Sequence, residues 1–171
     1  MPTQNTGATK FYSNKQESLI ADYLGWKRTS GSGARPFQKG DIYSDDFLGE
    51  CKTHTKSQAD VAFMLLDWRK LLIEAKGASR KPILFSDNGT QELEYTFCMI
   101  DRKFSDVRDV ILQKDIPAIT SVYPTKIRFN ADALKYLLGD HSAISVDTDK
   151  MNLVIMPLVV FKRMLDGDFY D

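Results

Sequence analysis

A predicted hairpin constrains the fold more than any other feature of the sequence. Residues 41–44 and 46–53 both have strand character, and a tight turn of Ser and Asp residues joins them. Because side chains alternate across a strand, Glu50 and Lys52 point to one face of the second strand. Cys51 points to the opposite face, which we expect to be packed. The hairpin therefore presents a carboxylate and an ammonium side by side.

The residues of this hairpin suit metal-dependent hydrolysis of a phosphodiester. The turn brings Asp41, at the start of the first strand, back towards Glu50. Two carboxylates and a backbone carbonyl, here that of Cys51, suit Mg²⁺, for which Mn²⁺ is the expected substitute. Lys52 would then lie beside the metal-bound water and the scissile phosphate and stabilise the negative charge that develops. The alternative is an exposed hairpin with ordinary surface charges.

Hydrophobic periodicity predicts the surrounding elements. A helix over 14–24 begins at an N-cap of Ser13 or Asn14, and a Gly- and Ser-rich loop occupies 29–40. A long buried helix over 57–76 begins at a capping box, Ser57–Asp60. Further along we expect strands at 82–85, 94–99, up to 129, 143–147 and 152–156, and helices at 103–113, 130–138 and from Pro157.

This element order predicts a single α/β domain over residues 1–171, with a central mixed sheet flanked by helices. The chain has 171 residues, of which 43% are hydrophobic, enough for one core and too few for two. We expect a core over about 10–115 and an α+β extension over about 116–171 that packs on it.

Charge and cysteine content limit the partners and the compartment. Formal net charge is zero, so nucleic-acid binding would depend on local clusters of positive charge. Two cysteines without a metal-ligand spacing indicate a reducing compartment. The sequence shows no signal peptide and no apolar run of membrane-spanning length. We therefore expect a cytoplasmic protein without a membrane partner, from a prokaryote or a phage-infected host. Basic residues cluster before residue 41, at Lys10, Lys15, Lys27, Arg28, Arg35 and Lys39.

Several motifs occur in an order that resembles a known family. Glu17, then Ser30-Gly-Ser-Gly-Ala34, then Gly40-Asp41 and Glu50-Cys-Lys52 resemble the archaeal-type Holliday junction resolvases of the PD-(D/E)xK nuclease superfamily. The resemblance covers about residues 10–87, and Gly40 stands where the family has Pro. It implies a restriction-endonuclease-like nuclease core, a bound Mg²⁺, branched DNA as substrate, a role in DNA recombination and a homodimer.

The resemblance also assigns roles to individual residues. It implies that Glu17 is a further metal-binding or water-positioning carboxylate and that Ser32 lies near the scissile phosphate. Basic side chains flank both segments and are candidates for backbone phosphates, whose contacts weaken with salt. His54 and Gln58 are further candidates next to the strand. Ordinary solvent-exposed positions are the alternative for each of them. The candidate DNA-binding residues are Ser32, Lys27, Arg28, Arg35, Lys39 and Lys56.

The function predicted from these patterns is a metal-dependent DNA endonuclease, structure-selective for Holliday or other branched junctions. One alternative is a restriction-type or nicking endonuclease that acts on duplex DNA. Another is an inactive nuclease-fold protein that binds DNA or serves in assembly. Two symmetric cuts require a two-fold dimer. The apolar face of the last helix, or of the strand at 152–156, is the expected interface.

Overall fold

The computed structural model describes residues 6–29 and 40–169. Its helices are α1 (Thr6–Leu24), α2 (Leu65–Gly77), α3 (Ala131–Leu138) and α4 (Leu158–Leu165), with 3-10 turns η1 (Leu93–Tyr95), η2 (Arg102–Phe104) and η3 (Gln113–Asp115). The strands of a larger sheet are β1 (Lys27–Arg28), β2 (Ile42–Tyr43), β3 (Phe47–Lys52), β5 (Lys81–Asp87), β6 (Thr96–Asp101), β7 (Asp109–Leu112), β10 (Ser142–Asp147) and β11 (Asn152–Pro157). Those of a smaller sheet are β4 (Asp60–Met64), β8 (Thr120–Val122) and β9 (Lys126–Asn130).

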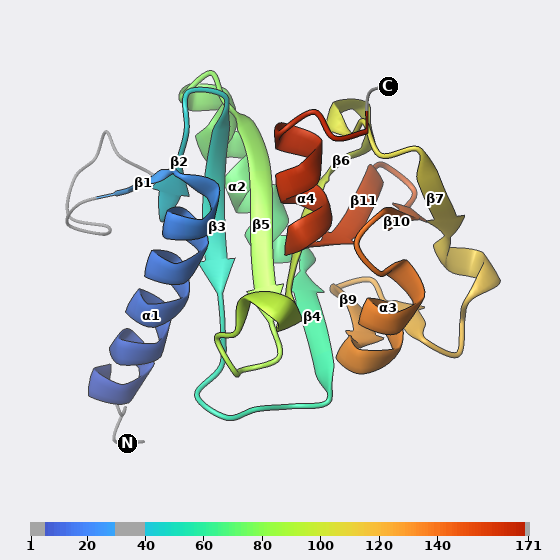
Figure 1. Cartoon of the computed structure of the whole chain (residues 1–171), viewed down its shortest axis with the longest axis horizontal. Helices are drawn as coiled ribbons and strands as arrows, with labels where there is room; N and C mark the ends of the chain where they lie inside the picture. Colours follow the sequence, from blue (N-terminus) through green and yellow to red (C-terminus); the bar gives the residue numbers. More distant parts are fainter. Residues whose placement is uncertain (1–5, 30–39, 170–171) are drawn as a thin grey trace.

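The larger sheet is mixed, which confirms the predicted α/β class with a mixed central sheet. Its strand order is β1-β2-β3-β5-β6-β11-β10-β7 (Figure 1). The β3–β5 and β7–β10 pairs are parallel, and its other pairs are antiparallel. A parallel pair needs a long crossover connection, and between β3 and β5 this connection consists of β4 and α2.

Apolar side chains form one core on each face of the larger sheet. On one face, Ile20 of α1 and Phe161 of α4 pack against Phe47, Cys51 and Phe85. The other core combines α2, α3 and the smaller sheet with alternate residues of the same strands. Figure 1 shows α1 and α4 in front of the sheet and α2 behind it. Burial on both faces therefore fixes the register of β3, because a slip by one residue would exchange its two sets of side chains.

Helix α1 begins earlier than the sequence predicts. It starts at Thr6, so the predicted N-cap at residues 13–14 is wrong and Asn14 lies inside the helix. The Asn14 Oδ1 accepts a hydrogen bond from the Arg28 guanidinium at 3.3 Å. The first turns of α1 carry mostly exposed side chains. Hydrophobic periodicity therefore gives no signal for them.

The predicted helix over 57–76 is wrong in its first part, where residues 60–64 form strand β4. Val61 and Phe63 are buried and alternate with more exposed neighbours, as in a strand with one buried face. β4 pairs with β9, and Phe63 packs against Phe129 at a ring-centroid distance of 6.1 Å. Helix α2 therefore begins at Leu65, and the predicted capping box at 57–60 precedes a strand instead.

The predicted helix over 103–113 is also wrong. This segment contains the short turn η2 and then β7, which pairs in parallel with β10. By contrast, α3 begins where the sequence predicts. The Asn130 side chain caps it by accepting a hydrogen bond from the Ala133 N–H at 2.9 Å.

Residues from 116 onwards, expected as an extension, contribute β10 and β11 to the larger sheet. β11 lies between β6 and β10, so its apolar residues are interior and do not form a free interface. Helix α4 likewise buries Val160 and Phe161 and leaves Val159 partly exposed. The apolar surfaces expected to form a dimer interface therefore serve the core of the chain itself.

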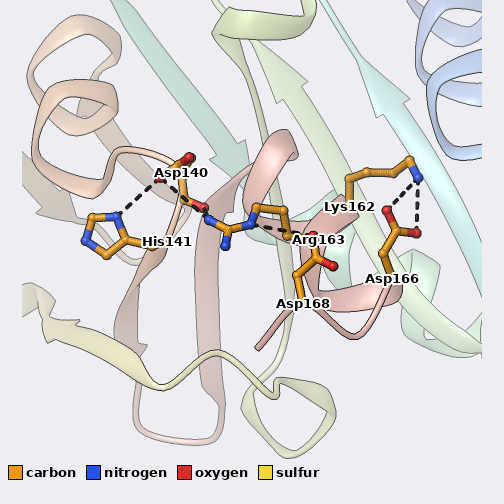
Figure 2. A network of polar contacts seen from close by, with 6 residues as sticks. All are labelled: Asp140, His141, Lys162, Arg163, Asp166 and Asp168. Atoms are coloured by element: carbon orange, nitrogen blue, oxygen red, sulfur yellow. Dashed lines mark hydrogen bonds and ion pairs between the residues drawn. The ribbon is translucent and has the colours of Figure 1, made fainter. Parts of the chain in front are cut away.

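Surface ion pairs connect α4 to the turn before β10. Figure 2 shows Arg163 directed towards Asp140, whose carbonyl accepts a hydrogen bond from the guanidinium at 2.6 Å. In the same view Lys162 pairs with Asp166 at 2.8 Å, one helical turn away. Exposed pairs of this kind contribute at most about 1 kcal/mol each. The position of α4 therefore depends mainly on its buried apolar face.

Gly89, in the turn after β5, provides a test of the packing. Its φ is +86°, and a Cβ there would lie 2.1 Å from the Lys56 carbonyl oxygen. We expect Gly89→Ala to lower the free energy of unfolding by about 2–4 kcal/mol in urea titrations, because strain and overpacking add. Gly77→Ala is the control, since a Cβ there meets open space. Equal stabilities of the two variants would contradict this packing.

Candidate functional site

Strand β3 presents Glu50 and Lys52 on the face that meets α2. The Lys52 Nζ lies 3.5 Å from the Glu50 Oε1, as expected for side chains two residues apart. A small cavity of about 30 Å³ separates this face from α2, and Asp67 and Lys70 contribute to its lining. Lys52 also lies 3.9 Å from the Asp67 carboxylate, so its ammonium stands between two acids.

Asp41 is attached to β3 through its backbone and its side chain. The Asp41 N–H donates to the carbonyl of Gly49, the residue that pairs with Ile42, at 2.8 Å. The Asp41 Oδ2 accepts the Cys51 N–H at 2.8 Å. The sequence expectation that a hairpin returns Asp41 to the Glu50 segment thus agrees with the geometry.

Glu17 approaches the same place from α1. Its Oε2 pairs with the Arg28 guanidinium at 2.9 Å, and Arg28 also donates to Ser18. Burial, together with the nearby Asp41 carboxylate, raises the pKa of Glu17 to about 7, although Arg28 opposes this. The Glu17 side chain of α1 therefore lies near Asp41, which directly precedes β2.

The same repulsion acts on Glu50. Burial is the largest cause that raises its pKa to about 7, and Asp41 is the second. Lys52 opposes the rise, and Glu74 of α2 adds to it. Burial lowers the pKa of Lys52, but the carboxylates of Glu50, Asp67 and Asp41 outweigh it and the net change is upward. Lys52 therefore stays protonated beside the acids.

The Cys51 side chain points away from these groups into the core. Burial raises the pKa of its thiol well above the ordinary value, and the surrounding carboxylates add to this rise. The thiol is therefore protonated and unsuited to bind a metal as thiolate. Any contribution of Cys51 to a metal would come from its backbone.

The donor set fits a hard divalent cation. Asp41 and Glu50 supply carboxylate oxygens. Burial first, and the Asp41 carboxylate second, raise the pKa values of Glu17 and Glu50, and a cation would favour their ionised forms. In the described parts of the chain, however, no three His, Cys, Asp or Glu side chains come together as a ready metal site. Of the candidate ligands, Glu17 is paired with Arg28 and Glu50 with Lys52.

The other predicted site residues lie on β1, in the loop after β3 or outside the described residues. Arg28 pairs with Glu17, and Lys27 is exposed on the same short strand. The exposed loop after β3 carries His54, Lys56 and Gln58. The backbone of Gln58 donates to the Asn88 carbonyl at 2.7 Å. Three predicted DNA contacts lie outside the described residues, namely Ser32, Arg35 and Lys39.

Sequence reasoning missed the contribution of α2. Asp67, Lys70 and Glu74 follow one another at spacings of three and four on the side that faces Glu50 and Lys52. Spacings of three and four mark these charged residues as one helical stripe in the sequence, but the predicted helix over 57–76 rests on its apolar positions. The sequence analysis also missed Gln16. This residue is 1% exposed, and its Nε2 donates a hydrogen bond to the Lys52 carbonyl at 2.5 Å.

Comparison of the chain with protein-family models, with curated proteins and with solved structures gave no match. The site must therefore be interpreted from its own geometry. Within the described ranges, none of the helices combines the length and the apolar character required to cross a membrane.

The raised pKa of Glu50 predicts how stability depends on pH without metal. Between pH 4.5, the ordinary value, and about pH 7, the folded state binds more protons than the unfolded state, so stability falls as pH rises through 7. We expect a loss of roughly 2 kcal/mol from pH 5 to pH 8 in urea titrations with EDTA. Glu50→Gln should reduce this dependence, whereas Glu92→Gln, at an exposed position, should retain it. An unchanged profile for Glu50→Gln would contradict the buried, repelled state of this carboxyl.

Proposed function

We propose that this protein is a metal-dependent DNA endonuclease that hydrolyses phosphodiester bonds, with branched DNA such as Holliday junctions as its substrate. The observation that carries the proposal is the attachment of the Asp41 carboxylate to the β3 backbone at Cys51, between Glu50 and Lys52. This hydrogen bond brings Asp41, which directly precedes β2, next to the part of β3 that carries Glu50 and Lys52.

The order of elements supports the same proposal. Helix α1 carries Glu17, β2 and β3 form the hairpin, and α2 leads to β5, which lies parallel to β3. This order agrees with the restriction-endonuclease-like core that the motif resemblance implies for residues 10–87. On the basis of this connectivity and of the site, we propose that the chain has a restriction-endonuclease-like core.

The residues of the site have distinct tasks in the proposed reaction. Asp41 and Glu50 would hold Mg²⁺, or Mn²⁺ in its place. When bound, the ion supplies a water of lowered pKa and polarises a phosphate oxygen. Lys52, protonated and half exposed, donates hydrogen bonds to a non-bridging phosphate oxygen and stabilises the charge that grows there. Glu17 positions water or contributes a further ligand once Arg28 turns to the DNA backbone.

Two copies of the chain would provide the two symmetric cuts that a four-way junction requires. Lys27 and Lys56 are exposed at positions near the two strands of the site and are proposed to contact backbone phosphates. Because the formal net charge of the chain is zero, attraction of DNA would come from such local positive charges.

Cleavage assays test the proposal. We expect the protein to cut a labelled four-way junction in Mg²⁺ and not in EDTA. Asp41→Asn, Glu50→Gln and Lys52→Ala should each lower kcat by about 100-fold or more, because each removes a group that stabilises the transition state. Asp166→Asn, in the surface pair of Figure 2, is the control and should retain full activity.

A linear duplex of the same sequence separates the alternatives. Cleavage of the junction alone supports the proposed substrate. Cleavage of the duplex at defined sites identifies a restriction-type or nicking enzyme, and binding without cleavage in Mg²⁺ and in Mn²⁺ identifies an inactive nuclease fold. Full activity of Asp41→Asn or Glu50→Gln would show that the proposed site is wrong.

A further inference from the structure

Side chains from two other elements bind the end of β3 at Lys52 and the next residue, Thr53. On one side the Gln16 amide of α1 donates to the Lys52 carbonyl at 2.5 Å. On the other, the Thr53 hydroxyl donates to the Asp87 Oδ1 at 2.6 Å. Gln16 and Asp87 are 1% and 0% exposed, so their side chains bind the strand end from the interior of the protein.

The turn after β5 completes this arrangement. Gln91 donates from its Nε2 to the Thr53 hydroxyl at 2.9 Å and to the His54 carbonyl at 2.8 Å. The Gly89 N–H donates to the same Asp87 oxygen at 2.8 Å. The Thr53 hydroxyl therefore both donates and accepts, which fixes its rotamer. The strand end and the loop that follows it are attached to one buried turn.

Strand β3 needs such support at this position. Within the described chain, β2 pairs with β3 at Leu48 and Gly49, and no paired β2 residue lies opposite Glu50 to Lys52. On the other side β5 pairs as far as Lys52 and Ser86. The segment that carries the proposed chemistry thus has a strand neighbour on one side only, and side chains from α1 and from the turn fix its end.

The arrangement is not optimised for stability. Burial raises the pKa of the Asp87 carboxyl, and among the described atoms the Gln16 Oε1 is buried without a hydrogen-bond partner. Gln91 has a φ of +55°, an uncommon conformation for a residue other than glycine. Unpaired buried oxygens and backbone strain persist together where the surrounding structure holds a site in place.

We propose that Gln16, Thr53 and Asp87 are positioning residues that fix the end of β3 and thereby the place of Lys52 beside Asp41 and Glu50. They act through the Lys52–Thr53 peptide and touch neither metal nor DNA. This inference rests on the proposed nuclease function. Gln16 directly precedes Glu17 in α1. The same helix therefore binds the Lys52 carbonyl and carries Glu17, a candidate site carboxylate.

Variants of Thr53 test the inference. Thr53→Val removes the hydroxyl and keeps the shape, whereas Thr53→Ser keeps the hydroxyl. We expect Thr53→Val to lower kcat for junction cleavage by about 10- to 100-fold, because displacements near 1 Å have effects of this size. KM and the Mg²⁺ concentration for half-maximal rate should change by less than about threefold, since no ligand or DNA contact is removed. Thr53→Ser should remain within about threefold of wild type.

Thr90→Val is the matched control. The Thr90 hydroxyl lies in the same turn, donates to the Asn88 Oδ1 at 2.7 Å and accepts from the Glu92 N–H at 3.3 Å, and neither partner belongs to β3. Full activity of Thr53→Val would overturn the inference. So would an equal loss in Thr53→Ser, or a parallel fall in melting temperature, kcat and DNA affinity, which is the pattern of a purely structural residue.

Amide hydrogen exchange gives a second measurement that does not depend on cleavage. Exchange at residues 51–54 should be about tenfold faster in Thr53→Val than in Thr90→Val, because the strand end loses a buried hydrogen bond. If the wild-type chain cuts no DNA, the proposed function fails and exchange alone decides the present inference. Equal exchange in both variants would then overturn it.

Discussion

The site depends on the burial of three neighbouring acidic residues, Glu17, Asp41 and Glu50, beside strands β2 and β3. Two unit charges 4 Å apart interact by about 1 kcal/mol in water and by about 4 kcal/mol near a protein surface. Burial is the main cause that raises the pKa of both Glu17 and Glu50, and the nearby Asp41 carboxylate adds to each rise. Like charges in that position persist because the backbone of Cys51 holds Asp41 and because Arg28 and Lys52 provide cations. A positively charged ligand would favour the ionised forms of these carboxyl groups.

The framework around these residues explains how the charges are tolerated. Strand β3 is buried on one face by α1 and α4 and is covered on the other by α2, so its register cannot slip. Only the last residues of the strand reach solvent, and these are the residues with charged side chains. Burial of apolar side chains in the two cores thus offsets the cost of burying the carboxyl groups of Glu17, Asp41 and Glu50. The buried turn at Asp87 extends this support to the end of the strand.

The sequence predicted the parts of the molecule whose patterns are local. The hairpin, the shared face of Glu50 and Lys52 and the Asn130 cap depend on neighbours within a few residues, and each agrees with the structure. The helix predicted for 60–64 is wrong because the apolar residues there suit a helix and a strand equally. Its pairing partner, β9, lies more than sixty residues away. The Gln16–Lys52 contact spans 36 residues and involves an amide of ordinary type, so no local pattern marks it.

The strand order of the larger sheet has a consequence for synthesis of the chain. The β3–β5 pair and the helix behind it are complete once residue 87 has been made. Strand β6, however, keeps an open edge until β11 arrives, more than fifty residues later. An open hydrophobic strand edge is a template for association with other chains. During translation the proposed catalytic half can therefore fold early, while protection of its sheet from aggregation waits for the last strand.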